Sequence, residues 1–552
     1  MSTFTVTNTN NSGAGSLRQA VLNANAMTGK DIINFGGPFT DGLAHTISLT
    51  GSGLSITDDL IIVGTNPSKL TIKDDTADRV FDIASGVISA INGLTITNTY
   101  NGSNGTPGGG GISNEGVLTL NNSIITGNTV YHNAINFYGN TTSAGGGIYN
   151  TGSLTVNYSN ISNNSAGDVL SANGDGGGIY NTGSLTVNYS NITGNTTGYG
   201  GGVYSDQDLK TSIKSNSVSV NYSTISHNSS AGEGGGIYLH YGTLNHDTVT
   251  NNSASEEGGG IYLYDAQVNY SIITNNSVGS SGGGISLSQG TVNYSSISGN
   301  SAGDIGGGIS GQGTVNYSSI SGNWSPSGGG IVGIDGLTVN YGSITDNTAD
   351  YGGGIYVTNG GGIVNHSIIS GNTAKDAGGG IFYSGLISPD SDLGFNDHIV
   401  VIDSTLSNNQ AGIGAAVYND GNLTLAKSTI SNNKAQSGGG IYNDGALILS
   451  NSTLSNNQAH FGGGIYNDGI LTVGNSIIRH NKAFGIELSS GKFESGKGGG
   501  IYTSDSAGYP APTLDYSTVA CNFDTPEEDS NKFIKLDNIV GKFINIGSVV
   551  RV

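Results

Sequence analysis

The sequence predicts an all-β fold, a parallel β-helix of about 17 to 18 stacked coils with an N-terminal capping helix. The first observation is a repeated phrase: "GGGIYNDGALILSNSTLSNNQA" at 438–459 recurs as "GGGIYNDGILTVGNSIIRHNKA" at 462–483. The second is strand-forming chemistry inside each copy, and the third is a column of asparagines at one position of the repeat. A fixed period of roughly 24 residues is typical of a solenoid, in which each repeat packs on its neighbours.

The units are strand-forming rather than helical. An isoleucine or valine closes each glycine run, and these markers run from Ile112 to Ile501, mostly 22 to 26 residues apart. Between them lie short alternating stretches such as "SLTV", rich in Val, Ile, Thr and Tyr and broken by Gly, Asn and Asp. Three short strands and three turns fit in one unit, so one repeat is one coil. Ile273, Ile297 and Ile320 are expected inside successive coils, and the glycine runs are expected where coils approach closely or need positive φ.

Asparagine holds one position in 15 copies, from Asn128 to Asn522. A side-chain amide there can bond the amides above and below it, and asparagine tolerates the left-handed backbone of a sharp corner. We interpret the column as a corner ladder. The alternative is a polar binding groove.

The two ends differ from the repeats. Residues 1–46 are predicted to form a strand and a helix that cap the first coil, with Ser16 as N-cap, Gln19 three residues on, and an apolar face of Leu17, Ala20, Val21 and Ala24. Residues 47–522 form the β-helix. The β-prone tail at 523–552 either caps its own last coil or pairs with a neighbouring molecule in a head-to-tail filament.

Charge limits the partners. The formal net charge is −21, and no Lys or Arg occurs between Arg79 and Lys210 or between Lys214 and Lys375. Nucleic acid and anionic membranes are therefore poor partners. No apolar run approaches a membrane span, and "MSTFTVTNTN" has neither the basic start nor the apolar core of a signal peptide, so the export route stays open.

The sequence contains few residues that indicate a catalytic site or a metal site. Hydrolysis of a sugar polymer needs a pair of carboxylates held apart, and the nearest candidates are Asp346 with Asp350, Glu256 with Glu257, and a set in an insertion, Asp390, Asp392 and Asp397. We interpret them as acidic turns that keep the protein soluble. The nine histidines show no ligand spacing, so we expect no catalytic residue, no cofactor and no metal.

Aromatic residues recur at two fixed positions of the repeat and form two columns. Polar residues replace the first in other coils, so we expect it to face water; the second follows the glycine runs and alternates with the inward isoleucine, so it should also point outward. Either column stabilises its own sheet or forms a contact surface for glycans or a neighbouring copy. The first column is Tyr158, Tyr189, Tyr222, Tyr270, Tyr294, Tyr317 and Tyr341; the second is Tyr149, Tyr180, Tyr204, Tyr238, Tyr262, Tyr356, Phe382, Tyr418, Tyr442, Tyr466 and Tyr502.

The opening "TVTNTNNSGAGSLRQAVLNANAM", followed by "DIINFGG" and by units of "GGGIYN" and "STISNN", resembles bacterial secreted right-handed parallel β-helix proteins. Such proteins are common in cyanobacteria, and their repeats are similar to those of chlamydial polymorphic outer-membrane proteins. The resemblance implies right-handed winding and an extracellular or cell-surface location. The chain departs from the calcium-binding relatives, because it has no Gly-Gly-x-Gly-x-Asp nonapeptides.

These observations predict a secreted or cell-surface structural or adhesive protein that self-assembles head to tail into a fibre or layer. Its expected partners are copies of itself, glycans or a neighbouring cell surface. The alternative function is a polysaccharide-active enzyme, a lyase or glycoside hydrolase, on the same scaffold. A groove with convergent carboxylates would favour the enzyme, and flat faces would favour the scaffold.

Overall fold

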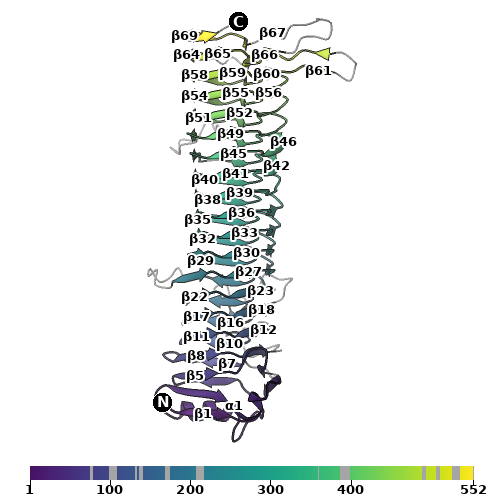
Figure 1. Ribbon diagram of the computed structural model, residues 1–552. Helices are drawn as coiled ribbons and strands as arrows, with labels where there is room; N and C mark the ends of the chain where they lie inside the picture. Colours follow the sequence, from purple (N-terminus) through teal and green to yellow (C-terminus); the bar gives the residue numbers. More distant parts are fainter. Residues whose placement is uncertain are drawn as a thin grey trace. The chain divides into compact units, whose positions relative to one another are not determined.

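The protein folds into stacked coils of parallel strands, which confirms the predicted all-β solenoid (Figure 1). The chain divides into two compact units, Met1–Gly279 and Ser280–Val552. The computed structural model describes residues 1–74, 79–98, 108–130, 134–135, 141–167, 174–206, 217–358, 360–385, 398–487, 493–504, 510–524, 535–536 and 538–550.

A coil of the first unit shows the common plan. Its first two strands lie in one sheet, its third in a second sheet and its fourth in a third. The next coil repeats the plan in register, so that Ile148 pairs with Ile179, Val156 with Val187 and Ile161 with Ile192. The first coil consists of β16 (Ile148–Asn150), β17 (Ser153–Asn157), β18 (Asn160–Ser162) and β19 (Ser165–Ala166), and the second of β21 (Ile179–Asn181), β22 (Ser184–Asn188), β23 (Asn191–Thr193) and β24 (Thr196–Thr197).

The second unit follows the same plan. Its two copies of the phrase quoted above pair in parallel and in register, with Ile441 opposite Ile465 and Leu449 opposite Val473. In some coils of either unit the first two strands merge into one longer strand, which in the first unit gives β29 (Ile237–Asn245) and β32 (Ile261–Asn269). The paired strands of the second unit are β53 (Ile441–Asn443) with β57 (Ile465–Asn467) and β54 (Ala446–Ser450) with β58 (Ile470–Gly474).

The core lies inside the coils. Ile273, Ile297 and Ile320 are all fully buried, as predicted. Ile273 of β33 (Ile272–Thr274) pairs with Val249 of the preceding coil, and Ile297 pairs with Ile320 within the second unit. Aliphatic side chains at the same position therefore stack along the inside of each unit, where each removes apolar area from water.

In copies that keep the glycine run, such as the one at 438–440, glycine serves both of the predicted purposes. Gly438, the first of its run, has φ +63°, which side chains rarely adopt. A Cβ atom on the next residue, Gly439, would lie 2.5 Å from the carbonyl oxygen of Gly463 in the following coil. The glycine run thus lets two coils approach at hydrogen-bonding distance.

The asparagine column is a buried ladder. Asn164 donates from Nδ2 to Asn195 Oδ1 at 2.9 Å and to the Ile125 carbonyl at 3.0 Å, and its backbone N–H donates to the same Asn195 oxygen. The side chain is fully buried, which matches the ladder interpretation. The left-handed residue, however, is the one before it: Asn163 has φ 55°, so the prediction that the column itself takes the left-handed corner is wrong by one position.

The N-terminal helix forms as predicted. In α1 (Leu17–Asn25), Ser16 is the N-cap and its Oγ accepts from the Gln19 backbone N–H at 3.2 Å. Leu17, Ala20, Val21 and Ala24 are the buried residues. The helix packs on β1 (Thr3–Val6), β2 (Asp31–Phe35) and β4 (Leu54–Ile56) at the N-terminal end of the first unit (Figure 1). β1 pairs with β2, and β2 pairs with β5 (Leu60–Val63), so the predicted cap segment already belongs to the sheet.

The tail continues the second unit. Three of its strands pair in parallel with the preceding coil of the same chain. They add one more set of rungs, and Ile544, Ile546 and Val549 on them are exposed. The strands are β68 (Ile539–Val540), β69 (Ile544–Ile546) and β70 (Val549–Val550), paired with β63 (Ile501–Thr503), β64 (Thr513–Asp515) and β65 (Thr518–Ala520).

One buried acid interrupts a second ladder. Serines at the corner after the second strand are buried, and the backbone N–H of each donates to the hydroxyl of the next, as Ser159 does to Ser190 at 3.0 Å. Two coils after Ser190, Asp247 replaces the serine at this corner. Its Oδ1 accepts from the Ser223 N–H at 2.8 Å, and its buried Oδ2 has no hydrogen-bond partner. Burial raises the pKa of Asp247 to about 7.

Substituting two adjacent residues of one strand, one buried and one exposed, tests which side chains point into the core. Ile273→Asp places an unpaired charge among buried side chains and should lower the free energy of unfolding by several kcal/mol. Ile272→Asp is the matched control, because Ile272 is 49 % exposed on the other face of β33. Thermal melting followed by circular dichroism should show a large loss for the first variant and little change for the second. Equal melting of the two variants would contradict the inward assignment.

Asp247 makes stability depend on pH. Its pKa is about 7 in the folded protein and near 3.8 when exposed, so the folded state holds the extra proton between these values. The contribution of Asp247 to the free energy of unfolding is greatest below pH 4. It is lost as pH rises through 7, which lowers the free energy of unfolding by about a few kcal/mol. Asp247→Ser restores the serine column and should lessen the fall in melting temperature between pH 5 and pH 8. Asp304→Ser removes an exposed acid and should leave the fall unchanged; an unchanged fall in Asp247→Ser would show that the carboxyl is not buried.

Candidate functional site

The first tyrosine column lies at the corner between the first and second sheets. Tyr158, for example, stands between β17 and β18, and all seven tyrosines have left-handed backbone with φ of 49 to 54°. Their side chains are 46 to 62 % exposed, so the column faces water as predicted. The left-handed backbone was not predicted, although asparagine at the same position in Asn122, Asn451 and Asn475 was a signal for it.

The rings of the column stack face to face. In the first unit Tyr158, Tyr189, Tyr222, His246 and Tyr270 stack in turn, with centroids 4.7 to 5.2 Å apart. In the second unit Tyr294, Tyr317, Tyr341 and His366 stack at 4.7 to 4.9 Å. Each inner ring therefore covers the faces of its neighbours, and a partner that approaches the column meets ring edges and hydroxyl groups.

Tyr158 ends the stack of the first unit. The same corner in the preceding coil holds Asn122, with φ 47°, and Tyr189 is the one described ring that stacks on Tyr158. Tyr158 is also the most exposed tyrosine of the column, at 62 %. One face of its ring is therefore open.

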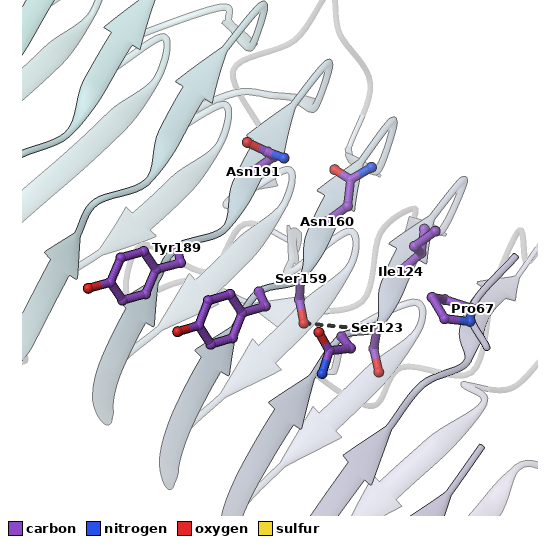
Figure 2. A pocket seen from close by; sticks show the side chains of 9 residues that line it. Pro67, Ser123, Ile124, Ser159, Asn160, Tyr189 and Asn191 are labelled. Atoms are coloured by element: carbon purple, nitrogen blue, oxygen red, sulfur yellow. Dashed lines mark hydrogen bonds between the residues drawn. The ribbon is translucent and has the colours of Figure 1, made fainter. Parts of the chain in front are cut away.

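An open hollow of about 470 Å³ lies at this end of the column. Figure 2 shows Tyr189 on one side of it, Pro67 on the other, and Asn160 and Asn191 along its edge. The lining comes from four coils and contains no charged side chain. It consists of Pro67, Asn122, Ser123, Ile124, Tyr158, Ser159, Asn160, Tyr189 and Asn191.

The polar groups of the hollow are of two kinds. The serines are engaged in the corner ladder, since the Ser123 N–H donates to Ser159 Oγ at 3.1 Å and Ser159 Oγ donates to the Asn157 carbonyl at 2.8 Å. The amides are not: Asn160 Oδ1 has no hydrogen-bond partner, and no hydrogen bond among the described residues uses the side chain of Asn122 or Asn191. The hollow thus combines an aromatic wall with unengaged amides.

The second aromatic column is less accessible. Its members alternate with the buried isoleucines, as predicted, and stack within each unit, for example Tyr238 on Tyr262 at 4.8 Å. They are only half-buried rather than exposed, because residues of the preceding turn pack edge-on against them, as Tyr199 does against Tyr238 and Tyr351 against Phe382. This burial raises the pKa of the Tyr262 hydroxyl to about 12.

A polar cluster that the sequence analysis missed lies beside this column in the first unit. The Tyr204 hydroxyl donates to Asp206 Oδ2 at 3.3 Å, and Asp206 Oδ1 lies 2.9 Å from His240 Nδ1, outside hydrogen-bond geometry. His240 Nε2 is 3.1 Å from the Tyr238 hydroxyl. The signal was present: Asp206 and His240 each stand three residues after a repeat marker. Asp206 directly follows β25 (Val203–Ser205) and His240 lies on β29, and these two strands pair in register.

Two further acids near this cluster have raised pKa values. Burial, helped by the negative charge of Asp206, raises the pKa of Asp175 to about 7. Burial also raises the pKa of Glu233 to about 7, with contributions from Glu257 and Glu256. Two acids with raised pKa values beside a third carboxyl and an imidazole are the ingredients of acid–base chemistry.

The acidic pairs proposed from the sequence are placed as follows. Glu256 is exposed and Glu257 half-buried, close enough to Glu233 to affect its pKa. Asp346 is exposed at a left-handed turn with φ 56°, and Asp350 is half-buried in β42 (Thr348–Tyr351). Neither pair lines the hollow. Asp390, Asp392 and Asp397 lie outside the described residues.

Two other kinds of site are absent from the described part of the chain. No group of three or more His, Cys, Asp or Glu side chains is placed to hold a metal ion. No helix there is long and apolar enough to cross a bilayer.

Comparison with known proteins agrees with the fold. A family model described as the right-handed β-helix region matches residues 393–522, and the Chlamydia polymorphic membrane protein repeat matches residues 222–240 and 248–264. No curated protein matches. Among solved structures, the Dettilon tailspike protein (gp208) is 13 % identical with a TM-score of 0.33, and the alignment covers 67 % of this chain and 65 % of that chain. The chain thus spans less than two thirds of the tailspike chain; its own fold is a right-handed parallel β-helix, with repeats similar to those of polymorphic membrane proteins.

Proposed function

We propose that this protein is a structural or adhesive protein of the cell surface or extracellular space, and that the exposed tyrosine column is its contact surface. The observation that carries the proposal is the column itself: seven tyrosines at left-handed corners, stacked within each unit and 46 to 62 % exposed. A bulky residue at positive φ costs free energy that asparagine or glycine would not. Corner geometry alone therefore does not explain the tyrosines.

The location rests on the repeats. Their likeness to polymorphic membrane protein repeats supports an extracellular or cell-surface setting. The net charge of −21 disfavours nucleic acid and anionic membranes as partners. Ring edges and hydroxyls can instead contact glycans or a second copy of the chain, and many weak contacts in register add avidity.

Self-assembly is the finer form of this proposal. Exposed Ile544, Ile546 and Val549 on β69 and β70 give the second unit an apolar surface that another molecule can cover. Head-to-tail contacts of this kind do not close on themselves and so produce filaments. Light scattering and electron microscopy of the intact protein would detect them.

Removing part of the column tests the contact surface. Changing Tyr294, Tyr317 and Tyr341 together to Asn should weaken binding to glycans or cells, or self-association, about tenfold. The melting temperature should change little and should not fall, because asparagine accepts the left-handed backbone without the strain of tyrosine, which outweighs the lost stacking. Tyr516→Asn is the matched control, since Tyr516 is exposed at an equivalent corner with φ 46° and has no described ring stacked on it. Unchanged association in the triple variant would leave the column with a structural role alone.

A second candidate function is a polysaccharide-active enzyme. The cluster of Asp206, His240 and Tyr238, with Asp175 and Glu233 beside it, favours this candidate. It has one of the features that hydrolysis needs, an acid whose pKa is raised close to a second carboxyl. We propose that the cluster is structural and that the protein is not an enzyme.

Incubation with polysaccharides separates the two functions. The intact protein should release no product from neutral or uronate polymers between pH 5 and pH 8. Asp206→Asn and His240→Gln should then change only stability. Reproducible product release that either substitution abolishes, while circular dichroism shows an intact fold, would establish the enzyme instead.

A further inference from the structure

We infer that the hollow beside Tyr158 is a binding subsite for a ring of a neutral sugar, at the end of the tyrosine column. This inference rests on the proposed adhesive function and names its ligand class. Nothing in the repeat requires such a hollow. It exists because Asn122 replaces tyrosine at one corner and the turn at Pro67 lies next to it.

The open face of Tyr158 supplies the stacking surface. Inner tyrosines of the first unit have neighbours 4.7 to 5.2 Å away on both faces, so no ligand can lie flat on them. Tyr158 is covered on one face by Tyr189, and its other face borders the hollow. A pyranose ring has a face of C–H groups, which packs on an aromatic ring as other apolar groups do.

The amides of the hollow suit hydroxyl groups. Each of Asn122, Asn160 and Asn191 carries one acceptor and two donors, and a sugar hydroxyl is both donor and acceptor. Asn160 Oδ1 is itself buried, so the amides that a ligand can reach are those of Asn122 and Asn191, which are exposed. An aromatic wall with a few polar groups around it is the usual composition of a small-molecule site.

The absence of charge in the lining selects a neutral ligand. No Asp, Glu, Lys, Arg or His is among the nine lining residues. A uronate would need a cation to hold it, and the stretch from Arg79 to Lys210, which supplies all of the lining except Pro67, contains neither Lys nor Arg between those two residues. A nucleotide would meet the same obstacle and the net charge of −21 as well.

One substitution should close the site without disturbing the coil. Asn122→Tyr places a ring at a corner whose φ, 47°, is close to the 49 to 54° of the tyrosines in the column. The new ring would stack on Tyr158 and fill the hollow. Asn451→Tyr is the matched control: Asn451 has φ 49° at the same corner of a coil in the second unit, is exposed and does not line the hollow.

Isothermal titration calorimetry with neutral gluco-, manno- and galacto-configured hexasaccharides, and with oligogalacturonate as the acidic comparison, tests the inference. We expect the intact protein to bind at least one neutral hexasaccharide, Asn122→Tyr to bind it at least tenfold more weakly, and Asn451→Tyr to bind it unchanged. Both variants place tyrosine at left-handed backbone, so each should stay folded and melt slightly below the intact protein. A second readout is Asn191→Leu, which removes an exposed amide of the lining and should weaken binding while leaving the Tyr158 face open.

The outcomes separate this inference from the proposed function. Neutral-sugar binding that survives Asn122→Tyr but fails when Tyr294, Tyr317 and Tyr341 are changed would overturn the subsite and keep the adhesive column. Preference for oligogalacturonate would overturn the neutral class. Self-association lost in Asn122→Tyr, with no sugar bound by any protein, would show that the hollow holds a second copy. Absence of both sugar binding and self-association in the intact protein would overturn the subsite and the proposed function together.

Discussion

The buried asparagine ladder is the constraint on which the rest of the structure depends. Each amide, such as that of Asn164, donates to the asparagine of one neighbouring coil and to the carbonyl of the Ile125 strand on the other side, while its own oxygen accepts from the coil before it. A coil without this residue would leave buried donors and acceptors unpaired in two neighbours, at a cost of about 1 to 3 kcal/mol for each group. The repeat is therefore copied closely, because every coil must present the same group at the same height.

Once the coils are held in register, the corner after the second strand of each coil determines which side chains the surface presents. The residue after the second strand has left-handed backbone and lies outside the core, so its side chain is free to vary: Asn122, His246, Asp403 and Lys427 all occupy this position and are exposed. Tyrosine is a poor choice for such backbone, and ring stacking, worth about 0.5 to 1.5 kcal/mol per pair, offsets only part of the cost. The column is thus a feature that the fold tolerates and does not require.

The sequence predicted the parts of the structure that repeat. The period, the inward isoleucines, the Ser16 cap and the asparagine ladder all follow from residues that recur or from local helix signals. The left-handed corner was placed one residue late because many copies read Asn-Asn, as in Asn163 and Asn164, and composition cannot tell which of the two turns. The hollow was not predictable, because Pro67, Asn122 and Tyr158 are brought together only by the number of residues in each intervening coil.

Sites in such a molecule arise where one coil departs from its neighbours. Identical rungs produce a uniform surface, on which no position is chemically distinct from the next. Asp247 in the serine column creates a buried acid, and Asp206 and His240 at adjacent rungs place a carboxyl beside an imidazole. Asn122 in the tyrosine column exposes a ring face that every inner tyrosine has covered. The uniform rungs supply stability and a long contact surface, and the exceptions supply chemical individuality, so the residues that break the repeat are the ones to examine for specific binding.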